Sequence, residues 1–259
     1  MIVDDIMKKA RDEIGYIEKS HKAFSLYGNN CLWPKTEYSG SDNYNKYALI
    51  AGHENGEPWC QSFIDAVLVE SVGKEMANKL LCGKLSSPST MEVKNAMVKA
   101  GREVRLDEAK PGDILYRSRS GGGHVGFCDG WENGELVSIE GNTSASDSSS
   151  WNGGQVARHV GGKWMWCVRP DWSLLDWHWT REDGIWYYQN AEGKNSYGWK
   201  KIKETDGVFS HWYYFNKVGQ MLTGCQYIDG MWYFLMPTGP LEGACCKSDD
   251  DGHQYVWNL

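Results

Sequence analysis

The sequence predicts an α+β domain followed by a solenoid of β-hairpins, and three observations support this. In the first hundred residues, apolar positions recur three or four apart, which is the period of an amphipathic helix. From there to about residue 170, apolar and polar positions alternate, as in strands. Beyond residue 170 an aromatic motif recurs, and residues 171–259 hold 8 of the 14 tryptophans and 8 of the 14 tyrosines. Helices first and strands later indicate helices packed on an antiparallel sheet.

Two helices are predicted outside the candidate site. The first lies near the N-terminus, where five apolar residues share one face: Ile2, Ile6, Ala10, Ile14 and Ile17. The second begins at Ser89, because Glu92 three residues later completes a capping box. Its inward face comprises Val93, Ala96, Met97 and Ala100, and Gly101 ends it. Pro111-Gly112-Asp113 then turns the chain into a strand at Ile114-Leu115-Tyr116.

A third helix is expected to begin at Cys60, the candidate nucleophile. The apolar spacing continues through Phe63, Ile64, Val67 and Ser71, and Gly73 suits the C′ position. The thiolate is the reactive form of cysteine, and both a helix N-terminus and a neighbouring imidazole lower the pKa of a thiol. The backbone N–H of Cys60 is also a natural oxyanion donor. The alternative is a buried cysteine with a purely structural role.

The candidate partners of Cys60 lie on two predicted strands. His124 follows three glycines, and the alternation of Val125 and Phe127 with it predicts a half-buried strand. A second strand over residues 136–139 places Glu140 and Asn142 at its end, where a carboxylate or amide can accept the second ring N–H of His124. The remaining histidines are interpreted as surface or structural residues: His21, His53, His159, His178, His211 and His253.

These motifs together resemble the CHAP domain, a cysteine- and histidine-dependent amidohydrolase or peptidase that cuts peptidoglycan. The resemblance covers about residues 2–170 and is carried by Pro58-Trp59-Cys60, Pro111-Gly112-Asp113-Ile114, His124-Val125-Gly126 and Ile139-Glu140-Gly141-Asn142-Thr143-Ser144. Two further segments, residues 15–19 and 43–47, are similar to CHAP enzymes of clostridial bacteria and their phages.

The resemblance implies a papain-like fold and a role for each candidate residue. Cys60 is the nucleophile, and His124 is the general base and later the acid. Glu140 orients His124, and Asn142 positions the imidazole or helps to hold the oxyanion. The bond that is cut stays open: the muramoyl–L-alanine amide, or a peptide bond of the stem or cross-bridge. The alternatives are an NlpC/P60-type wall peptidase and a catalytically inactive wall-binding protein.

No metal or other cofactor is predicted. Some staphylococcal-phage CHAP enzymes bind calcium through an acidic run just before the cysteine. The corresponding residues 51–58 of this chain hold only two acidic side chains, Glu54 and Glu57. Calcium takes six to eight oxygen ligands, so two scattered glutamates do not predict a site.

An aromatic motif recurs three times after residue 170. Trp186, Trp212 and Trp232 each open a run of aromatic residues, and we expect each run to pair with a short strand after the Gly-containing turn that follows it, as in residues 219–224. Such hairpins cannot bury a face alone, so they stack as a solenoid. The alternative is that the aromatic rings form only the core between hairpins.

This part, from about Thr180 onward, resembles the choline-binding or cell-wall-binding repeats of streptococcal and clostridial wall proteins. In that family, rings of neighbouring hairpins surround the quaternary ammonium of choline on teichoic acid, a cation–π interaction. Gly198-Trp199 fits the family's Gly-Trp step, whereas Cys225 and Ala244 stand where tryptophans are expected. The predicted ligand-binding residues are Trp186, Trp199, Trp212, Tyr214 and Trp232, and Trp257 lies beyond the repeats. A wall carbohydrate is the alternative ligand.

Composition favours two domains, residues 1–170 and 171–259, with a short aromatic link over residues 171–179. Their formal charges are 20 − 22 = −2 and 7 − 12 = −5, which argue against nucleic acid or an anionic membrane as partner and suit a cationic ligand. No apolar run predicts membrane insertion, and the N-terminus lacks a secretory signal. We therefore expect an endolysin-like protein held in the host bacterial cytoplasm before lysis; a shortened form of a secreted autolysin would look the same. The eight cysteines match neither a zinc spacing nor a disulfide framework.

Overall fold

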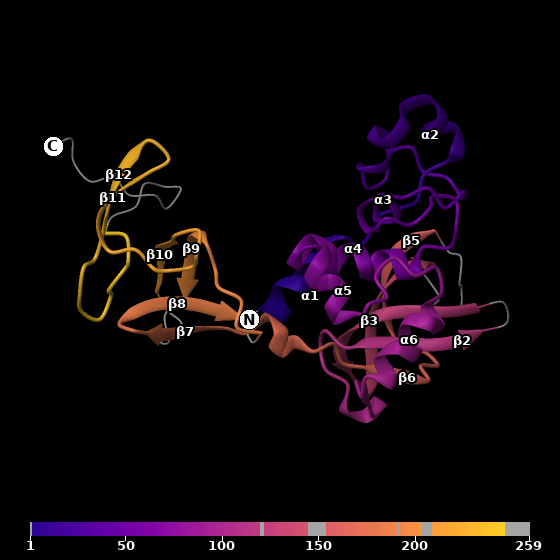
Figure 1. Cartoon of the computed structure of the whole chain (residues 1–259). Helices are drawn as coiled ribbons and strands as arrows, with labels where there is room; N and C mark the ends of the chain where they lie inside the picture. The colour runs from indigo at the N-terminus through magenta and orange to yellow at the C-terminus, as the bar shows by residue number, and fades with distance from the viewer. Residues whose placement is uncertain (1, 120–121, 145–153, 191, 204–208, 247–259) are drawn as a thin grey trace. The chain divides into compact units, whose positions relative to one another are not determined.

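The computed structural model describes residues 2–119, 122–144, 154–190, 192–203 and 209–246. The chain divides into two compact units, residues 1–172 and 173–259 (Figure 1). Their boundary lies two residues beyond the change in composition at Pro170. Within the described ranges, no helix is long and apolar enough to cross a membrane.

The first unit begins with helices. They are α1 (Ile2–Asp12), α2 (His21–Tyr27), α3 (Lys46–Ala51), α4 (Cys60–Val72), α5 (Lys74–Leu80) and α6 (Thr90–Lys99), with short 3₁₀ turns η1 (Gly28–Leu32) and η2 (Leu106–Glu108). Helix α1 is shorter than predicted, because the chain turns at Gly15 with a φ of 89°. Ile14 and Ile17 therefore lie outside it, and Ile17 instead forms an isolated bridge with Gln155.

The predicted ends of α4 and α6 are confirmed. Gly73 caps α4, and its N–H donates to the carbonyl of Val69. The Ser89 side chain accepts from the backbone N–H of Glu92 at 3.3 Å and so starts α6. Only this half of the capping box forms, because the Glu92 carboxylate binds Lys84 and the Ser87 hydroxyl instead.

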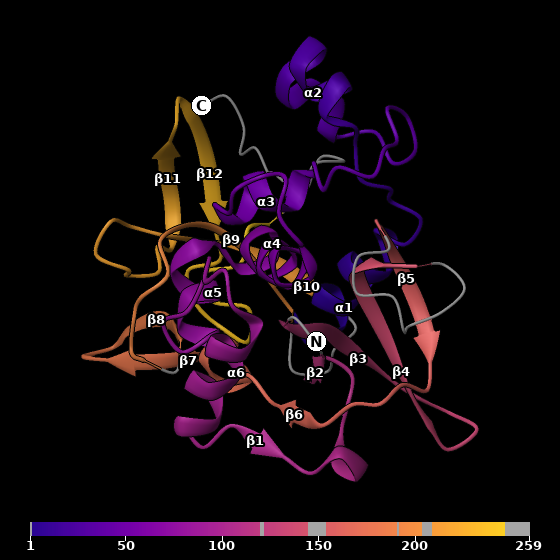
Figure 2. The same ribbon diagram turned by 90° about the vertical axis from the view of Figure 1, so that its right-hand side faces the viewer.

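A six-stranded antiparallel sheet follows in the order β1-β6-β2-β3-β4-β5. Its strands are β1 (Glu103–Val104), β2 (Ile114–Arg119), β3 (Gly122–Glu132), β4 (Glu135–Thr143), β5 (Gln155–Val160) and β6 (Trp166–Val168). Helices α4 and α6 pack against the central strands (Figure 2). The observed helices and sheet confirm the α+β class.

Two strand predictions need correction. Strand β3 is buried on both faces around His124, because helices cover one face and a cluster containing Trp164 and Ala109 covers the other. Glu140 and Asn142 do not end their strand, since β4 continues to Thr143 through a bulge after Glu140.

In the part of the second unit that the structure describes, three consecutive antiparallel hairpins follow the turn η3 (Trp172–Leu175). The hairpins pair β7 (Trp177–Glu182) with β8 (Ile185–Asn190), β9 (Gly198–Lys203) with β10 (Ser210–Phe215), and β11 (Gly224–Ile228) with β12 (Met231–Leu235). Two of the turns are Asp-Gly pairs with positive φ at both residues, at 183–184 and 229–230. This is the backbone of a type I′ turn, which matches the strand twist.

The predicted pairing of these strands is correct only in part. Each aromatic motif is the second strand of its hairpin, and its ladder runs along the strand before it, whereas the segment after it adds only isolated bridges. The segment after the middle motif pairs with it through an isolated bridge between Phe215 and Met221 and a backbone hydrogen bond from Leu222 N–H to the carbonyl of Tyr214. Trp177 and Trp179, assigned from sequence to the link, belong to the first hairpin.

The hairpins stack through aromatic rings. Trp179 of the first hairpin contacts Tyr213 and Phe215 of the second, with centroids 4.9 and 5.8 Å apart. Trp199 of the second contacts Tyr233 of the third at 4.7 Å. In each case the tryptophan packs against a small buried hydrophobic cluster that contains residues of the next hairpin. One hairpin therefore buries a face of the next, as a solenoid requires.

Candidate functional site

Cys60 is the first residue of α4, and the first N–H groups of a helix have no acceptor within the helix. Its side chain is 5% exposed and lines a pocket of about 660 Å³. The pocket wall comes from the loop before α4, the start of α6 and the start of β3, and it includes His53, Glu57, Gln61, Ser89, Thr90 and Gly123.

Burial raises the pKa of the Cys60 thiol to about 11. The backbone N–H groups of Val125, Gln61 and Cys60 itself act in the opposite direction but do not outweigh desolvation. The lowered pKa expected from the helix N-terminus is therefore wrong in its net sign, and Cys60 is a neutral thiol at pH 7. The hydrogen bond from the backbone of Val125 to the Cys60 sulfur also places this sulfur beside β3, at the residue after His124.

His124 and Glu140 form a buried pair across two adjacent strands. His124 Nε2 lies 2.6 Å from Glu140 Oε2, and both side chains are fully buried. An ionised carboxylate only accepts hydrogen bonds, so the proton belongs on Nε2, and Nδ1 is the unprotonated ring nitrogen. Burial raises the pKa of Glu140, but the hydrogen bonds from His124 and Ser138 and the charge of Arg117 bring it below the usual value.

Sequence reasoning missed the two other donors to Glu140. Arg117 Nη2 donates to Oε2 at 2.9 Å, and Ser138 Oγ donates to Oε1 at 2.6 Å. The Arg117 guanidinium also lies 4.6 Å from the Trp164 ring, which stacks on His124 at 6.3 Å. Arg117 is directly opposite His124 in the β2–β3 register, so a predicted pairing of these strands would have found it.

Asn142 is fully buried and lies in the β4 bulge, with a φ of 54°. Gly141 separates it from Glu140 and allows β4 to approach the start of α4. A Cβ atom at Gly141 would lie 2.5 Å from the Phe63 Cβ and 3.0 Å from the Trp59 ring. The strand therefore holds Asn142 two residues from the Glu140 carboxylate, and its part in positioning the imidazole or the oxyanion stays a prediction.

His53, interpreted from the sequence as a surface or structural residue, lines the pocket. Its Nε2 lies 2.8 Å from Oδ2 of Asp65, a fully buried carboxylate on α4. Asp65 also accepts from Gln61 Nε2 at 2.7 Å and from the backbone N–H of Ser86 at 2.9 Å. The signal is an acidic residue one helical turn after Gln61, on the helix that begins with the candidate nucleophile.

All eight cysteines are free thiols. Among the residues that the structure describes, no group of three or more His, Cys, Asp or Glu side chains could hold a metal ion. That the protein needs no metal or other cofactor stays a prediction.

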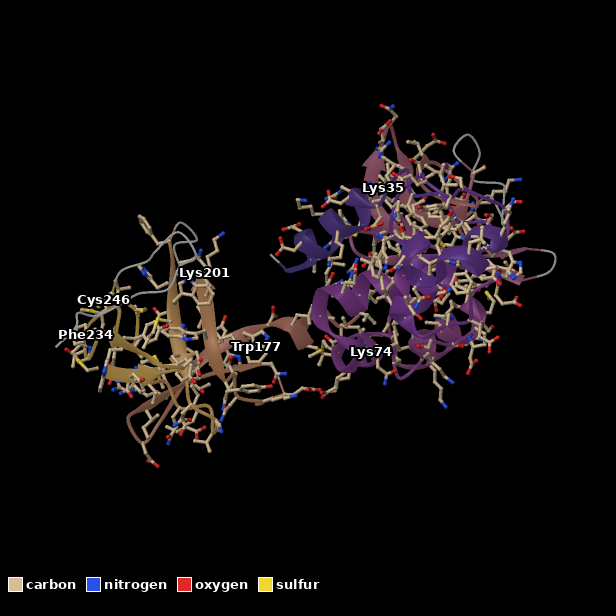
Figure 3. All side chains as sticks on the ribbon, turned by 90° about the horizontal axis from the view of Figure 1, so that it is seen from above. Lys35, Lys74, Trp177, Lys201, Phe234 and Cys246 are labelled. Atoms are coloured by element: carbon tan, nitrogen blue, oxygen red, sulfur yellow. The ribbon has the colours of Figure 1, made fainter. Side chains whose placement is uncertain are left out.

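Three of the predicted ligand-binding residues come together on the middle hairpin. Trp199 lies opposite Tyr214, and Lys201 lies opposite Trp212, so all four residues share one face of the hairpin. The Trp199 ring is 6.5 Å from Trp212 and 5.1 Å from Tyr214, both edge to face. Figure 3 labels one residue of each hairpin: Trp177 in β7, Lys201 in β9 and Phe234 in β12.

The other two predicted residues lie on different hairpins. Trp186 packs 6.1 Å from Trp179 on the first hairpin, and Trp232 is 53% exposed and 5.3 Å from Tyr227 on the third. The five residues thus lie on three hairpins, and whether they bind a ligand stays a prediction. Trp257 and His253 lie outside the described residues.

Neither a protein-family model nor a curated protein matches the sequence. Among solved structures, the chain is similar to the choline binding domain of a Streptococcus pneumoniae protein, at 28% identity over 27% of this chain and 94% of that domain, with a TM-score of 0.22. It is also similar to choline binding protein F of Streptococcus pneumoniae, in a structure with a peptidoglycan analogue, at 21% identity over 53% of this chain and 45% of that one, with a TM-score of 0.22.

A further structure, of the same protein in complex with ipratropium, matches at 22% identity over 53% of each chain, again with a TM-score of 0.22. The chain thus spans about half the length of choline binding protein F.

Proposed function

We propose that this chain is a bacterial cell-wall protein. Its first unit hydrolyses an amide or peptide bond of peptidoglycan by a thiol mechanism, and its second unit binds choline of teichoic acid through aromatic faces. One observation carries the hydrolase: the Cys60 sulfur, at the start of α4, lies against the backbone of the residue after His124, and His124 donates to the buried carboxylate of Glu140 at 2.6 Å.

The first half of the reaction forms an acyl-enzyme. Because the thiol pKa is about 11, Cys60 keeps its proton until attack. His124 Nδ1 takes that proton while the sulfur bonds to the carbonyl carbon, and Glu140 stabilises the resulting imidazolium. The backbone N–H of Cys60 donates to the oxyanion. When the C–N bond breaks, His124 returns the proton to the leaving amine and a thioester remains.

The second half repeats this sequence with water as the nucleophile. His124 removes a proton from a water molecule as its oxygen attacks the thioester carbonyl. The tetrahedral intermediate collapses, the C–S bond breaks, and the proton on His124 passes to the sulfur. The products are a free carboxylic acid and the Cys60 thiol, so no redox partner is needed.

The aromatic faces of the second unit support the binding role. A cation over a tryptophan face contributes about 0.5–1 kcal/mol when exposed and about 2 when desolvated. Trp199, Trp212 and Tyr214 offer three rings on one face of the middle hairpin. The negative charge of residues 171–259 favours the approach of a cationic ligand.

The second candidate function is wall binding without hydrolysis. The observation that favours it is the state of Cys60, whose thiol is buried and has a raised pKa. Pre-activated cysteine nucleophiles instead have a lowered pKa and are partly exposed. With an inactive Cys60, only the aromatic hairpins of the second unit would act, as a wall-binding module.

Purified choline-bearing walls distinguish the two candidates. We expect the intact chain to pellet with walls and to clear their turbidity, whereas Cys60→Ala and Cys60→Ser pellet equally and clear nothing, because a hydroxyl here lacks sufficient activation. Cys128→Ala is the matched control, since burial also raises the Cys128 pKa to about 11 but this thiol lies away from the pocket. Clearing by Cys60→Ala would refute the thiol mechanism. Pelleting of the intact chain without clearing would establish wall binding alone.

A further inference from the structure

The first and second hairpins carry the same arrangement of two tryptophans. Trp179 and Trp186 are 6.1 Å apart at an interplanar angle of 80°. Trp199 and Trp212 are 6.5 Å apart at 82°. In each pair, the first ring packs on the next hairpin and the second ring lies closer to the turn end of its own hairpin. The two faces are therefore structurally equivalent.

The residue directly across the hairpin from Trp186, Trp212 or Trp232 differs among the three hairpins. It is Arg181 in the first, Lys201 in the second and Tyr227 in the third. In the first hairpin, the guanidinium carbon of Arg181 lies 5.1 Å from the centroid of the Trp186 ring. This is within the distance of a cation–π interaction, so the chain places its own cation on this aromatic face.

Further contacts hold that cation in place. Arg181 Nε donates to the carbonyl of Gly184 at 3.2 Å, and Arg181 Nη2 lies 4.0 Å from Glu242 Oε2. The same carboxylate oxygen accepts from Trp186 Nε1 at 3.3 Å. The face thus has the parts of a cation site, an aromatic ring and a carboxylate, and the Arg181 side chain between them is 49% exposed.

We propose that Arg181 is a built-in occupant of a quaternary-ammonium site on the first hairpin and closes that site to external ligands. An uncharged residue at this position opens the Trp186 face to choline. This inference rests on the proposed binding function of the second unit. The physical reason is competition, because a ring face accommodates one cation and the tethered guanidinium is always present at it. Repulsion between two cations adds to the exclusion.

The test observes the Trp186 indole N–H directly, by NMR of the ¹⁵N-labelled full chain. This signal is assigned as the one of the 14 tryptophan indole signals that Trp186→Phe removes. Choline chloride is titrated against sodium chloride of equal ionic strength. We expect the Trp186 signal to shift saturably with choline in Arg181→Gln and to stay unchanged in the wild-type chain. Lys200→Gln is the matched control, because it removes one positive charge from the opposite face of the middle hairpin, and its Trp186 signal should respond as in the wild type.

Each outcome bears on a different claim. A saturable choline shift of Trp186 in the wild-type chain, or none in folded Arg181→Gln, overturns the role of Arg181. If no other indole responds to choline in the wild-type chain but Trp186 responds in Arg181→Gln, the inference holds and the proposed choline binding by the natural chain fails. Retention of the remaining indole signals shows that the variant is folded.

Discussion

Replacing Glu140 by glutamine separates the charge of this residue from its hydrogen bonds. Oε2 of Glu140 accepts from both Arg117 and His124, and Oε1 accepts from Ser138. The amide oxygen of glutamine can take the place of Oε2, and its NH₂ group can donate to the Ser138 hydroxyl, which is also an acceptor. The tautomer of His124 is then kept, and only the negative charge is lost.

The loss can be estimated from the charge alone. A hydrogen bond to a charged group contributes about 1.5–3 kcal/mol and a neutral one about 0.5–1.5. The stabilisation of the imidazolium that forms during attack therefore falls by about 1–1.5 kcal/mol. This corresponds to about 5- to 15-fold slower turnover. The cost in stability is larger, because the Arg117 side chain is 5% exposed and loses its counter-charge. Removing one partner of a buried pair costs about 3–5 kcal/mol, and the retained amide acceptor favours the lower end.

The assay combines the initial rate of wall clearing with urea unfolding of the same preparations. Ser138→Ala is the control, because it removes one donor to Glu140 and keeps both the charge and the bond to His124. It should lose about 1 kcal/mol of stability with little change in rate. Two results refute the reasoning: a folded Glu140→Gln variant with no measurable turnover, or one with the full rate and full stability.

Three further predictions follow from the site and the hairpins. His53→Ala should lower kcat/KM much more than His159→Ala does, because Asp65 orients His53 in the pocket, whereas His159 bonds Thr143 outside it. Equal rates for the two variants would show that His53 has a structural role only. Iodoacetamide labelling of Cys60, followed by peptide mass spectrometry, should rise with pH towards the pKa of about 11, since the thiolate reacts and burial disfavours it; labelling already maximal and flat from pH 6 would indicate a stored thiolate. Trp199→Ala or Trp212→Ala should weaken wall pelleting by at most about 10- to 100-fold, more than Trp257→Ala; equal loss in all three would exclude a site on the middle hairpin.

Local sequence signals were enough to place Cys60, His124 and Glu140 on their helix and strands. Cys60 could be placed at a helix start because helical spacing and Gly73 bound its helix, and Glu140 lies on the strand after His124. Arg117 and the pair of His53 and Asp65 could not be found in this way. Their roles depend on strand register and on packing between segments that are distant in the sequence.

Two errors share a physical cause, which is that tertiary structure overrides local pattern. The sign of the Cys60 pKa shift depends on burial, which is set by the whole fold. The pairing of the aromatic strands depends on which turn joins the two strands of a hairpin. The Asp-Gly pairs at 183–184 and 229–230 favour the preceding strand as partner, a turn preference that the aromatic repeat itself does not show.

Mass spectrometry of muropeptides released from purified walls tests the central claim most directly. Walls are incubated with the intact chain, with Cys60→Ala or with Cys128→Ala, and the soluble fragments are compared. The thiol mechanism predicts one new family of fragments, whose new ends all come from cleavage of the same type of amide or peptide bond. The intact chain and Cys128→Ala release these fragments, and Cys60→Ala does not. The identity of that bond decides between amidase and endopeptidase. The same fragments from Cys60→Ala, or none from an intact chain that has bound the walls, would contradict the account.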